Sequence, residues 1–332
     1  MAGLEQSTSA IAAERTPVLV YTDLGRDVDD AEALAYLTGS DNTEVVGIVT
    51  THTIPDRRAT IARAFMAHLE QPEVPIGVGS IFPIGMEDEL LTKYLRDHTL
   101  IGTTYEGGGL IECFPSAEDI VMGAISKYGP ALKIAALAPL TDLAKVAQTH
   151  REEFSTIGGL FIQGQAEVGR NGLIIPDPEA YNIEVDLEAA DILFGLQRLI
   201  PFTLVGKHAA YPVSLSRNDF NDFESSGNQA GRYLNQHAIS GLRNFAVRAP
   251  GTFTRLFNIE PGNVDQLNII SRPYDALVAM AIAHPEHFTP TRVGHHALIG
   301  MSAEDPGLVS AKAIEEELIA KIKIALNSGA TG

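Results

Sequence analysis

Apolar, β-branched runs alternate with helical patterns along the first two thirds of the chain, and this alternation restricts the fold more than any other feature. Six segments have the length and composition of buried strands: 17–22, 44–50, 74–78, 132–137, 157–164 and 200–206. Helical patterns occupy 30–39, 56–69, 86–97, 116–129, 139–148 and 186–196. Such alternation is typical of an open, mostly parallel α/β sheet with helices on both faces and a Rossmann-like core.

The rest of the chain is predicted to be mainly helical. Residues 213–284 carry few strand signals, and 313–327 form a charged amphipathic pattern. No Pro/Ser-rich linker or repeat divides the chain, so we expect a disordered tail at 1–15 and a single domain over 16–330.

The charge balance narrows the classes of partner. A formal net charge of −18 disfavours nucleic acid, because phosphate binding needs clustered Lys and Arg. No apolar run is long enough to span a bilayer, and the first residues lack a secretory signal, so we expect a cytoplasmic protein without a membrane partner. The single Cys113 forms no internal disulfide and is predicted to be a small buried residue.

Four aspartates crowd the junction between the first strand and the first helix, in the stretch "TDLGRDVDDA". They are Asp23, Asp27, Asp29 and Asp30, and all lie at the carboxyl end of the predicted strand. Helix capping and the helix dipole account for one or two of them. A hard cation such as Ca²⁺ or Mg²⁺ accounts for all four, because it offsets the repulsion between neighbouring carboxylates.

This stretch resembles the N-terminal signature of the calcium-dependent inosine-uridine nucleoside hydrolases, Asp-x-Asp-Pro-Gly-x-Asp-Asp. Four residues match the signature: Asp23, Gly25, Asp29 and Asp30. Three features depart from it: Tyr21 stands for the first aspartate, Leu24 for the proline, and Asp27 and Val28 are inserted before the final pair.

Three further segments resemble family motifs in the same order. "ALAPLTDLA" is similar to the family's Gly-Pro-Leu-Thr-Asn turn, with Leu137 supplying the carbonyl that binds calcium in the family. "AYNIEVDLEAA" retains Asn182 and Asp186, and "PYDALVAMAIAHP" supplies Asp275. The resemblance therefore extends from residue 17 to about 290.

The resemblance implies a nucleoside hydrolase fold and a Ca²⁺-dependent hydrolysis of a small riboside to ribose and free base. It assigns the calcium ligands to Asp23, Asp30, the Leu137 carbonyl and Asp275. It makes Asp23 the general base as well, and it lets Asp29 and Asn182 bind ribose hydroxyls. Homo-oligomers, either dimers or tetramers, are usual in the family.

The resemblance is weakest around the leaving group. Tyr274 stands where the family has a general-acid histidine, and His52 stands for an asparagine after the second strand, as either a replacement acid or a surface loop residue. Glu179 lies one position from a family glutamate, and Asn171 is a candidate sugar contact.

The alternative is that the protein is a catalytically weakened relative, which binds a riboside or an ADP-ribose-like ligand. Arg26 and Arg170 lie in predicted site loops and are candidate phosphate contacts. The glycine-rich 105–110 segment is predicted to be an active-site flap.

Overall fold

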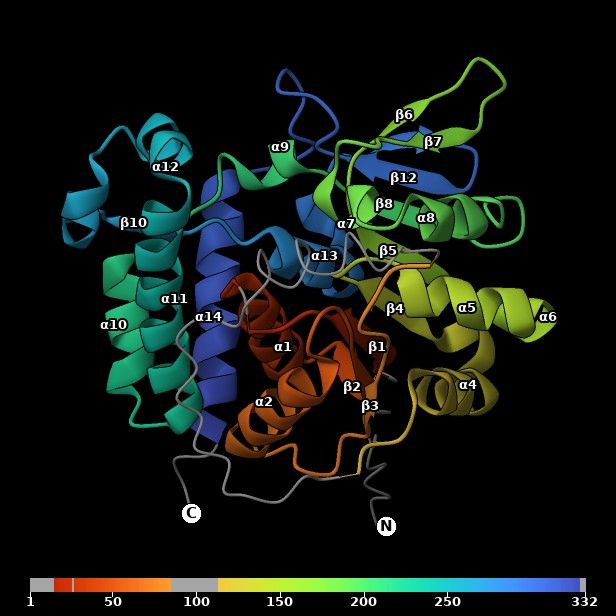
Figure 1. Cartoon of the computed structure of the whole chain (residues 1–332), viewed down its shortest axis with the longest axis horizontal. Helices are drawn as coiled ribbons and strands as arrows, with labels where there is room; N and C mark the ends of the chain where they lie inside the picture. The colour runs from red at the N-terminus through yellow and green to blue at the C-terminus, as the bar shows by residue number, and fades with distance from the viewer. Residues whose placement is uncertain (1–14, 26, 85–112, 329–332) are drawn as a thin grey trace, which may run out of the picture.

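A computed structural model describes residues 15–25, 27–84 and 113–328 of the chain (Figure 1). Several of the features expected from the sequence lie outside the described residues: almost all of the N-terminal tail at 1–15, Arg26, the helix at 86–97 and the flap at 105–110.

A central sheet of eight strands forms the middle layer of the protein. The order across the sheet is β11-β12-β8-β5-β4-β1-β2-β3. In that order the strands are Thr291–Val293, His296–Ile299, Phe202–Val205, Gly159–Gln163, Lys133–Ala136, Thr16–Thr22, Thr43–Thr50 and Ile76–Val78. Among the described residues, every pairing in this sheet is parallel except that of β11 with β12. The predicted open, mostly parallel α/β sheet is therefore confirmed.

Helices cover both faces of this sheet because successive side chains of a strand point to opposite faces. On β1, Val18 and Val20 enter one hydrophobic core, whereas Leu19 and Tyr21 enter the other. The first core lies under α1 (Asp29–Gly39), α2 (Pro55–His68), α13 (Tyr274–Ala283) and α14 (Ala311–Ser328). The second lies under α4 (Ala117–Tyr128), α5 (Thr141–Thr149) and α8 (Leu187–Phe194), on the opposite side of the sheet in Figure 1.

The remaining elements surround these layers. The longer helices among them are α10 (Arg217–Ser225), α11 (Gln229–Arg248) and α12 (Pro250–Phe257), which agree with the helical region expected from residue 213. The short helices are α6 (Arg151–Phe154), α7 (Tyr181–Glu184) and α9 (Lys207–Ala210). The 3-10 turns are Gly129–Ala131, Pro261–Gln266 and Pro285–His287. Two small antiparallel sheets pair β6 (Ala166–Val168) with β7 (Ile174–Pro176) and β9 (Leu215–Ser216) with β10 (Ile269–Ser271).

Several details differ from the sequence-based predictions, including the unpredicted small strands β6, β7, β9 and β10. The edge strand β11 and its neighbour β12 were not expected, because runs of three and four residues are too short to give a clear period. The helix predicted at 139–148 begins at Thr141, two residues later. Cys113, expected to be buried, is exposed, so its apolar neighbours were a poor guide to its environment.

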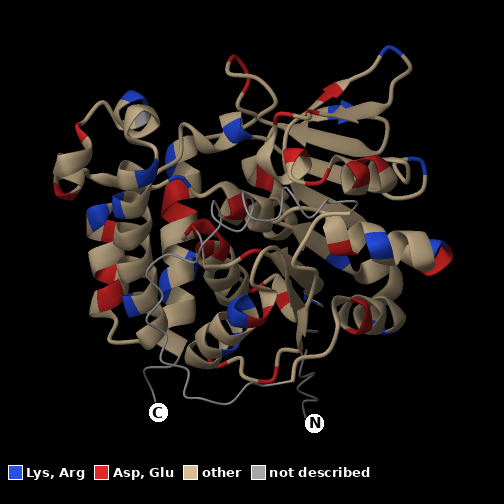
Figure 2. Ribbon diagram, viewed as in Figure 1, with Lys and Arg blue, Asp and Glu red and all other residues tan. Residues whose placement is uncertain are grey.

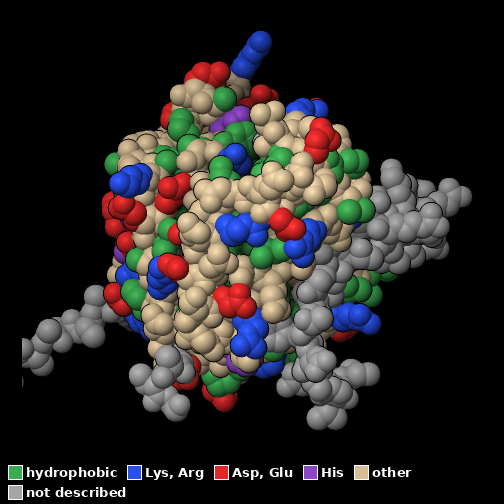
Figure 3. All heavy atoms as spheres, turned by 90° about the vertical axis from the view of Figure 1, so that its left-hand side faces the viewer, with side chains coloured by type: hydrophobic (Ala, Val, Ile, Leu, Met, Phe, Trp, Pro, Cys, Tyr) green, Lys and Arg blue, Asp and Glu red, His purple; other side chains and the backbone are tan. Residues whose placement is uncertain are grey.

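The surface carries mixed charges. Acidic and basic residues both occur along the outer helices (Figure 2). On the face formed by the left-hand side of Figure 1, Lys and Arg side chains are scattered among Asp and Glu (Figure 3). No helix within 15–25, 27–84 and 113–328 combines the length and apolar character needed to cross a bilayer.

Candidate active site

A pocket of about 310 Å³ lies at the carboxyl ends of β1, β4, β5 and β8. Parallel strands end at the same edge of a sheet, so the loops that follow them converge there. Acids, tyrosines and amides make up most of the pocket lining, with one lysine and a few apolar residues: Asp23, Asp27, Asp29, Asp30, Leu137, Gln163, Gly164, Gln165, Glu179, Ala180, Tyr181, Asn182, Lys207, Tyr211, Tyr274 and Asp275.

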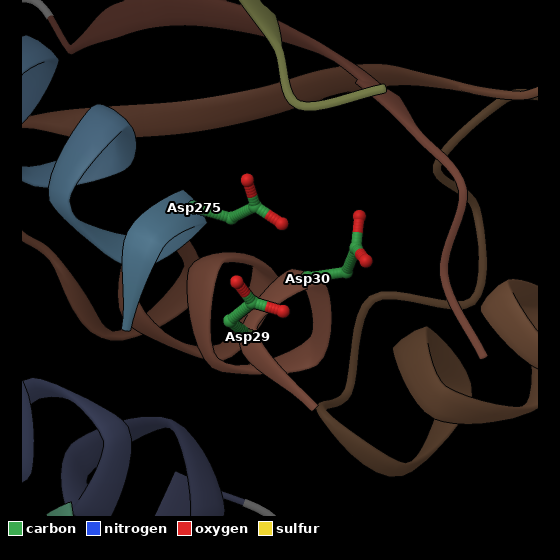
Figure 4. Close-up of side chains that lie close together, drawn as sticks. All are labelled: Asp29, Asp30 and Asp275. Atoms are coloured by element: carbon green, nitrogen blue, oxygen red, sulfur yellow. The ribbon is translucent and has the colours of Figure 1, made fainter. Parts of the chain in front are cut away.

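Three buried carboxylates meet in this pocket (Figure 4). Asp29 and Asp30 belong to the first turn of α1, and Asp275 belongs to the first turn of α13. Each offers an oxygen, and these oxygens all lie within 4.8 Å of one another. The pKa of each of the three groups is raised well above the usual range, mainly because the groups are buried and also because neighbouring carboxylates repel one another. This arrangement favours a ligand that brings positive charge.

Asp23 and Asp30 are connected through the end of β1. Gly25, with φ of 108°, lets the chain turn directly after Asp23. The Thr22 hydroxyl donates a hydrogen bond to Asp30 and accepts one from the Leu24 amide at 3.1 Å. Asp23 is buried and lines the pocket. However, the carboxylates whose oxygens lie within 4.8 Å of one another are those of Asp29, Asp30 and Asp275, whereas the family resemblance implied Asp23 in place of Asp29.

The Leu137 carbonyl and Asn182 also meet in the pocket. The Asn182 amide nitrogen lies 2.9 Å from the Leu137 carbonyl oxygen and 2.9 Å from Gln163 Oε1, and it donates hydrogen bonds to both. A carbonyl oxygen has two lone pairs, so the Leu137 oxygen keeps capacity for a second partner. Asp186 lies outside the pocket lining and caps α8, accepting from the Ala189 amide at 3.0 Å.

Tyr274 lines the pocket beside the three carboxylates. Burial, with Tyr211 and Asp29 as further causes, raises the pKa of Tyr274 to about 12. Its ring contacts Tyr211 edge to face, with 6.5 Å between centroids. Glu179 lines the pocket as well, so of the residues assigned to catalysis, sugar binding and metal binding only His52 and Asn171 lie outside the lining.

His52 lies just outside the pocket and is not a surface residue. It is buried after β2 in a left-handed conformation, with φ of 70°. Its Nε2 lies 3.3 Å from the hydroxyl of Tyr181, which does line the pocket. His52 is therefore one side chain removed from the cavity.

Asn171 lies in the turn between β6 and β7, which form the hairpin at the top right of Figure 1. It is exposed, and its Oδ1 accepts from the Leu173 amide at 3.1 Å. This contact stabilises the turn itself. Arg170 is exposed on the same hairpin.

Two departures from the family motifs lie next to each other in space. Tyr21 replaces the first aspartate of the signature, and Asp142 replaces the asparagine of the turn. The Tyr21 hydroxyl donates to Asp142 Oδ2 at 3.1 Å and accepts from the Asp142 amide at 3.1 Å. Tyr21 thus belongs to the core beneath α5 and does not line the pocket.

Sequence reasoning missed several lining residues, among them Gln163, Lys207, Tyr181 and Tyr211. Gln163 ends β5, and Lys207 follows β8 after one residue. A systematic search of strand ends would have found both. The two tyrosines lie in loops and short helices that carry no comparable signal.

Comparisons with known proteins agree with this architecture. A family model described as inosine-uridine preferring nucleoside hydrolase matches residues 18–324. A pyrimidine-specific ribonucleoside hydrolase from Photobacterium profundum is 24% identical over 215 residues, which cover 64% of this chain and 67% of that protein. A purine-preferring ribonucleoside hydrolase from Gardnerella vaginalis has a similar structure, with a TM-score of 0.70, 19% identity, and coverage of 94% of this chain and 99% of the other. The type III effector protein XopQ, solved with adenosine diphosphate ribose, gives a TM-score of 0.79 at 20% identity and covers 94% of each chain.

Proposed function

The chain belongs to the inosine-uridine preferring nucleoside hydrolase family, and from this premise we propose that it is a calcium-dependent hydrolase of the N-glycosidic bond of a riboside. The observation that carries the proposal is the convergence of Asp29, Asp30 and Asp275 in one pocket. These residues come from the two ends of the chain, and ordinary helix capping does not require them to meet.

The donor set of the pocket fits a hard dication. Its acidic side chains and backbone carbonyl offer only oxygen ligands, and the buried carboxylates repel one another unless positive charge is added. Asp23, Asp30, the Leu137 carbonyl and Asp275 would hold the ion. Ca²⁺ is favoured over Mg²⁺ because it accepts irregular sets of six to eight oxygens. When bound, such an ion orients sugar hydroxyls and makes a bound water more acidic.

The side chains of the pocket have the chemistry for the remaining steps. Asp29 and Asn182 hold ribose hydroxyls, and Glu179 lies at the rim for a further sugar contact. Asp23 takes a proton from the attacking water, whose oxygen forms a bond to C1′ while the C1′–N bond breaks. The electron pair of the broken bond passes to the base, and the Tyr274 hydroxyl donates the proton that the base needs.

Ribose release tests this proposal. Purified protein incubated with purine and pyrimidine ribonucleosides in Ca²⁺ is expected to release free ribose. Treatment with a chelator should stop the reaction, and added Ca²⁺ should restore it. A panel that yields no ribose at saturating Ca²⁺ would rule out hydrolysis of these nucleosides.

A second candidate function is binding of an ADP-ribose-like ligand. Lys207 lines an otherwise acidic pocket and makes no ion pair with any described residue, so its ammonium group is available to a phosphate. The structural similarity to XopQ, solved with adenosine diphosphate ribose, adds to this candidate.

Calorimetry separates the two candidates. If the second is correct, ADP-ribose should bind more tightly than ribose, and Lys207→Ala should weaken ADP-ribose binding about tenfold while leaving ribose binding unchanged. Lys312→Ala, a change to an exposed lysine on α14, is the matched control. Equal affinity of wild type and Lys207→Ala for ADP-ribose would contradict a phosphate contact.

A further inference from the structure

Arg58 is wholly buried in the first turns of α2, and its guanidinium group joins two loops beside the pocket. Nη1 donates to the Leu24 carbonyl at 2.9 Å and to the Asp23 carbonyl, so it holds the loop after β1. Nε donates to the His52 carbonyl at 2.9 Å, and Nη2 donates to the Thr53 hydroxyl at 3.2 Å, so they hold the loop after β2.

The loop after β2 needs such support. His52 and Thr53 have φ values of 70° and 61°, a left-handed conformation that disfavours residues with a Cβ. Residues with a Cβ persist in this region only where their surroundings hold them. Arg58 binds both residues, and the His52 ring then meets Tyr181 at the pocket wall.

Arg58 makes no ion pair with a described carboxylate, which is unusual for a buried charge. Its positive charge lies beside the acidic pocket, because two of its acceptors are the carbonyl oxygens of Asp23 and Leu24. The hydrogen bonds, however, all go to backbone carbonyls and one hydroxyl. The group therefore fixes the two loops in place as well as carrying charge.

We propose that Arg58 is a positioning residue of the active site, which fixes the Asp23 turn against the His52–Thr53 turn and thereby sets the cation ligands. This inference rests on the proposed calcium-dependent function. Only a planar guanidinium group reaches acceptors in both loops, because it presents several N–H donors in a rigid fork. A lysine ammonium group at the same position carries the charge but cannot bind all four acceptors.

The same helix provides a matched control. Arg63 also donates to backbone carbonyls, those of Pro72 at 2.7 Å and Val74 at 2.9 Å. These carbonyls precede β3, at the opposite edge of the sheet from the pocket. Arg63→Lys therefore removes comparable hydrogen bonds without touching the proposed ligands.

The test measures Ca²⁺ affinity by calorimetry and the midpoint of thermal unfolding in chelator, for wild type, Arg58→Lys and Arg63→Lys. Arg58→Lys should weaken Ca²⁺ binding about tenfold, because residues behind metal ligands typically contribute that much to affinity. Arg63→Lys should lower the unfolding midpoint and leave Ca²⁺ affinity within about twofold of wild type.

Each outcome decides the inference. If Arg58→Lys loses stability but binds Ca²⁺ as wild type does, Arg58 is merely structural and the inference is wrong. If wild type itself fails to bind Ca²⁺, the proposed function fails first, and the inference fails with it. If Arg58→Lys does not fold, Thr53→Val removes one acceptor of Arg58 while preserving side-chain shape, and about threefold weaker Ca²⁺ binding is then expected. Unchanged binding by folded Thr53→Val would overturn the inference.

Discussion

Asp30→Asn is expected to lower kcat/KM for riboside hydrolysis about 10³-fold and to weaken Ca²⁺ binding at least about 100-fold. Asp30 shares the carboxylate group with Asp29 and Asp275, and the Thr22 hydroxyl donates a hydrogen bond that fixes its orientation. The amide has nearly the same shape as the carboxylate but lacks its charge, so the pocket is preserved while the attraction for a dication falls.

The same substitution should stabilise the metal-free protein against thermal unfolding. Burial and neighbouring carboxylates raise the pKa of Asp30, so its ionised form is unfavourable in the fold. A raised pKa in the folded state means that stability is lost as pH rises through that pKa. Asp30→Asn should therefore unfold at a higher temperature than wild type when both are measured in chelator at neutral pH.

Asp56→Asn is the control for this pair of effects. Asp56 is an exposed aspartate in the first turn of α2, and its replacement changes the net charge by the same amount. It should leave Ca²⁺ affinity and ribose release unchanged. Retention of full activity by Asp30→Asn would remove the basis for the proposed cation site.

Tyr274→His is expected to increase kcat on ordinary nucleosides at least about tenfold, since general acid catalysis contributes 10²- to 10⁴-fold. Burial raises the pKa of Tyr274 to about 12, so the phenol is a weak proton donor near neutral pH. An imidazolium group, with an ordinary pKa of about 6.5, is a far stronger donor. The variant should lose activity as pH rises through the imidazole pKa, because the donor is then deprotonated.

Tyr274→Phe separates the hydroxyl from the ring. It retains the aromatic contact with Tyr211 and removes the proton donor, so residual hydrolysis should fall while Ca²⁺ binding is unchanged. A phenylalanine variant as active as wild type, together with no gain for Tyr274→His, would mean that the departing base is activated by another group.

The sequence predicted the structure best where a continuous apolar run forms a long buried strand. The runs at 17–22 and 44–50 correspond closely to β1 and β2, because long buried strands give continuous apolar stretches. Strand order then places the ends of β1, β4 and β5 at one edge, where Asp23, Leu137 and Gln163 line the same pocket.

Side-chain direction in loops could not be predicted in the same way. His52 does follow β2, but its left-handed backbone directs the ring to Tyr181 and leaves it outside the pocket lining. Asn171 lies in the segment expected to contact the sugar, yet the hairpin of β6 and β7 carries it to the surface. Neither outcome follows from residue type or spacing.

Arg58 was missed for a different reason. Arg57 and Arg58 are adjacent and chemically identical, and successive residues of a helix point about 100° apart. Only the rotation of α2 against the sheet decides which one is buried, and Arg57 is exposed. The polar residues of this helix give no periodic pattern that distinguishes the two.

The pocket forms only after α13 has been synthesised, because α1 and α13 each supply one of its walls. Asp30 is made early in synthesis, whereas Asp275 follows 245 residues later, so an unfinished polypeptide has only one wall of the site. Anything that binds both walls also holds the two ends of the fold together, and saturation to 100 times the dissociation constant adds about 2.7 kcal/mol against unfolding. The concentration of the ligand would thus affect the stability of the folded protein against unfolding as well as its catalytic rate.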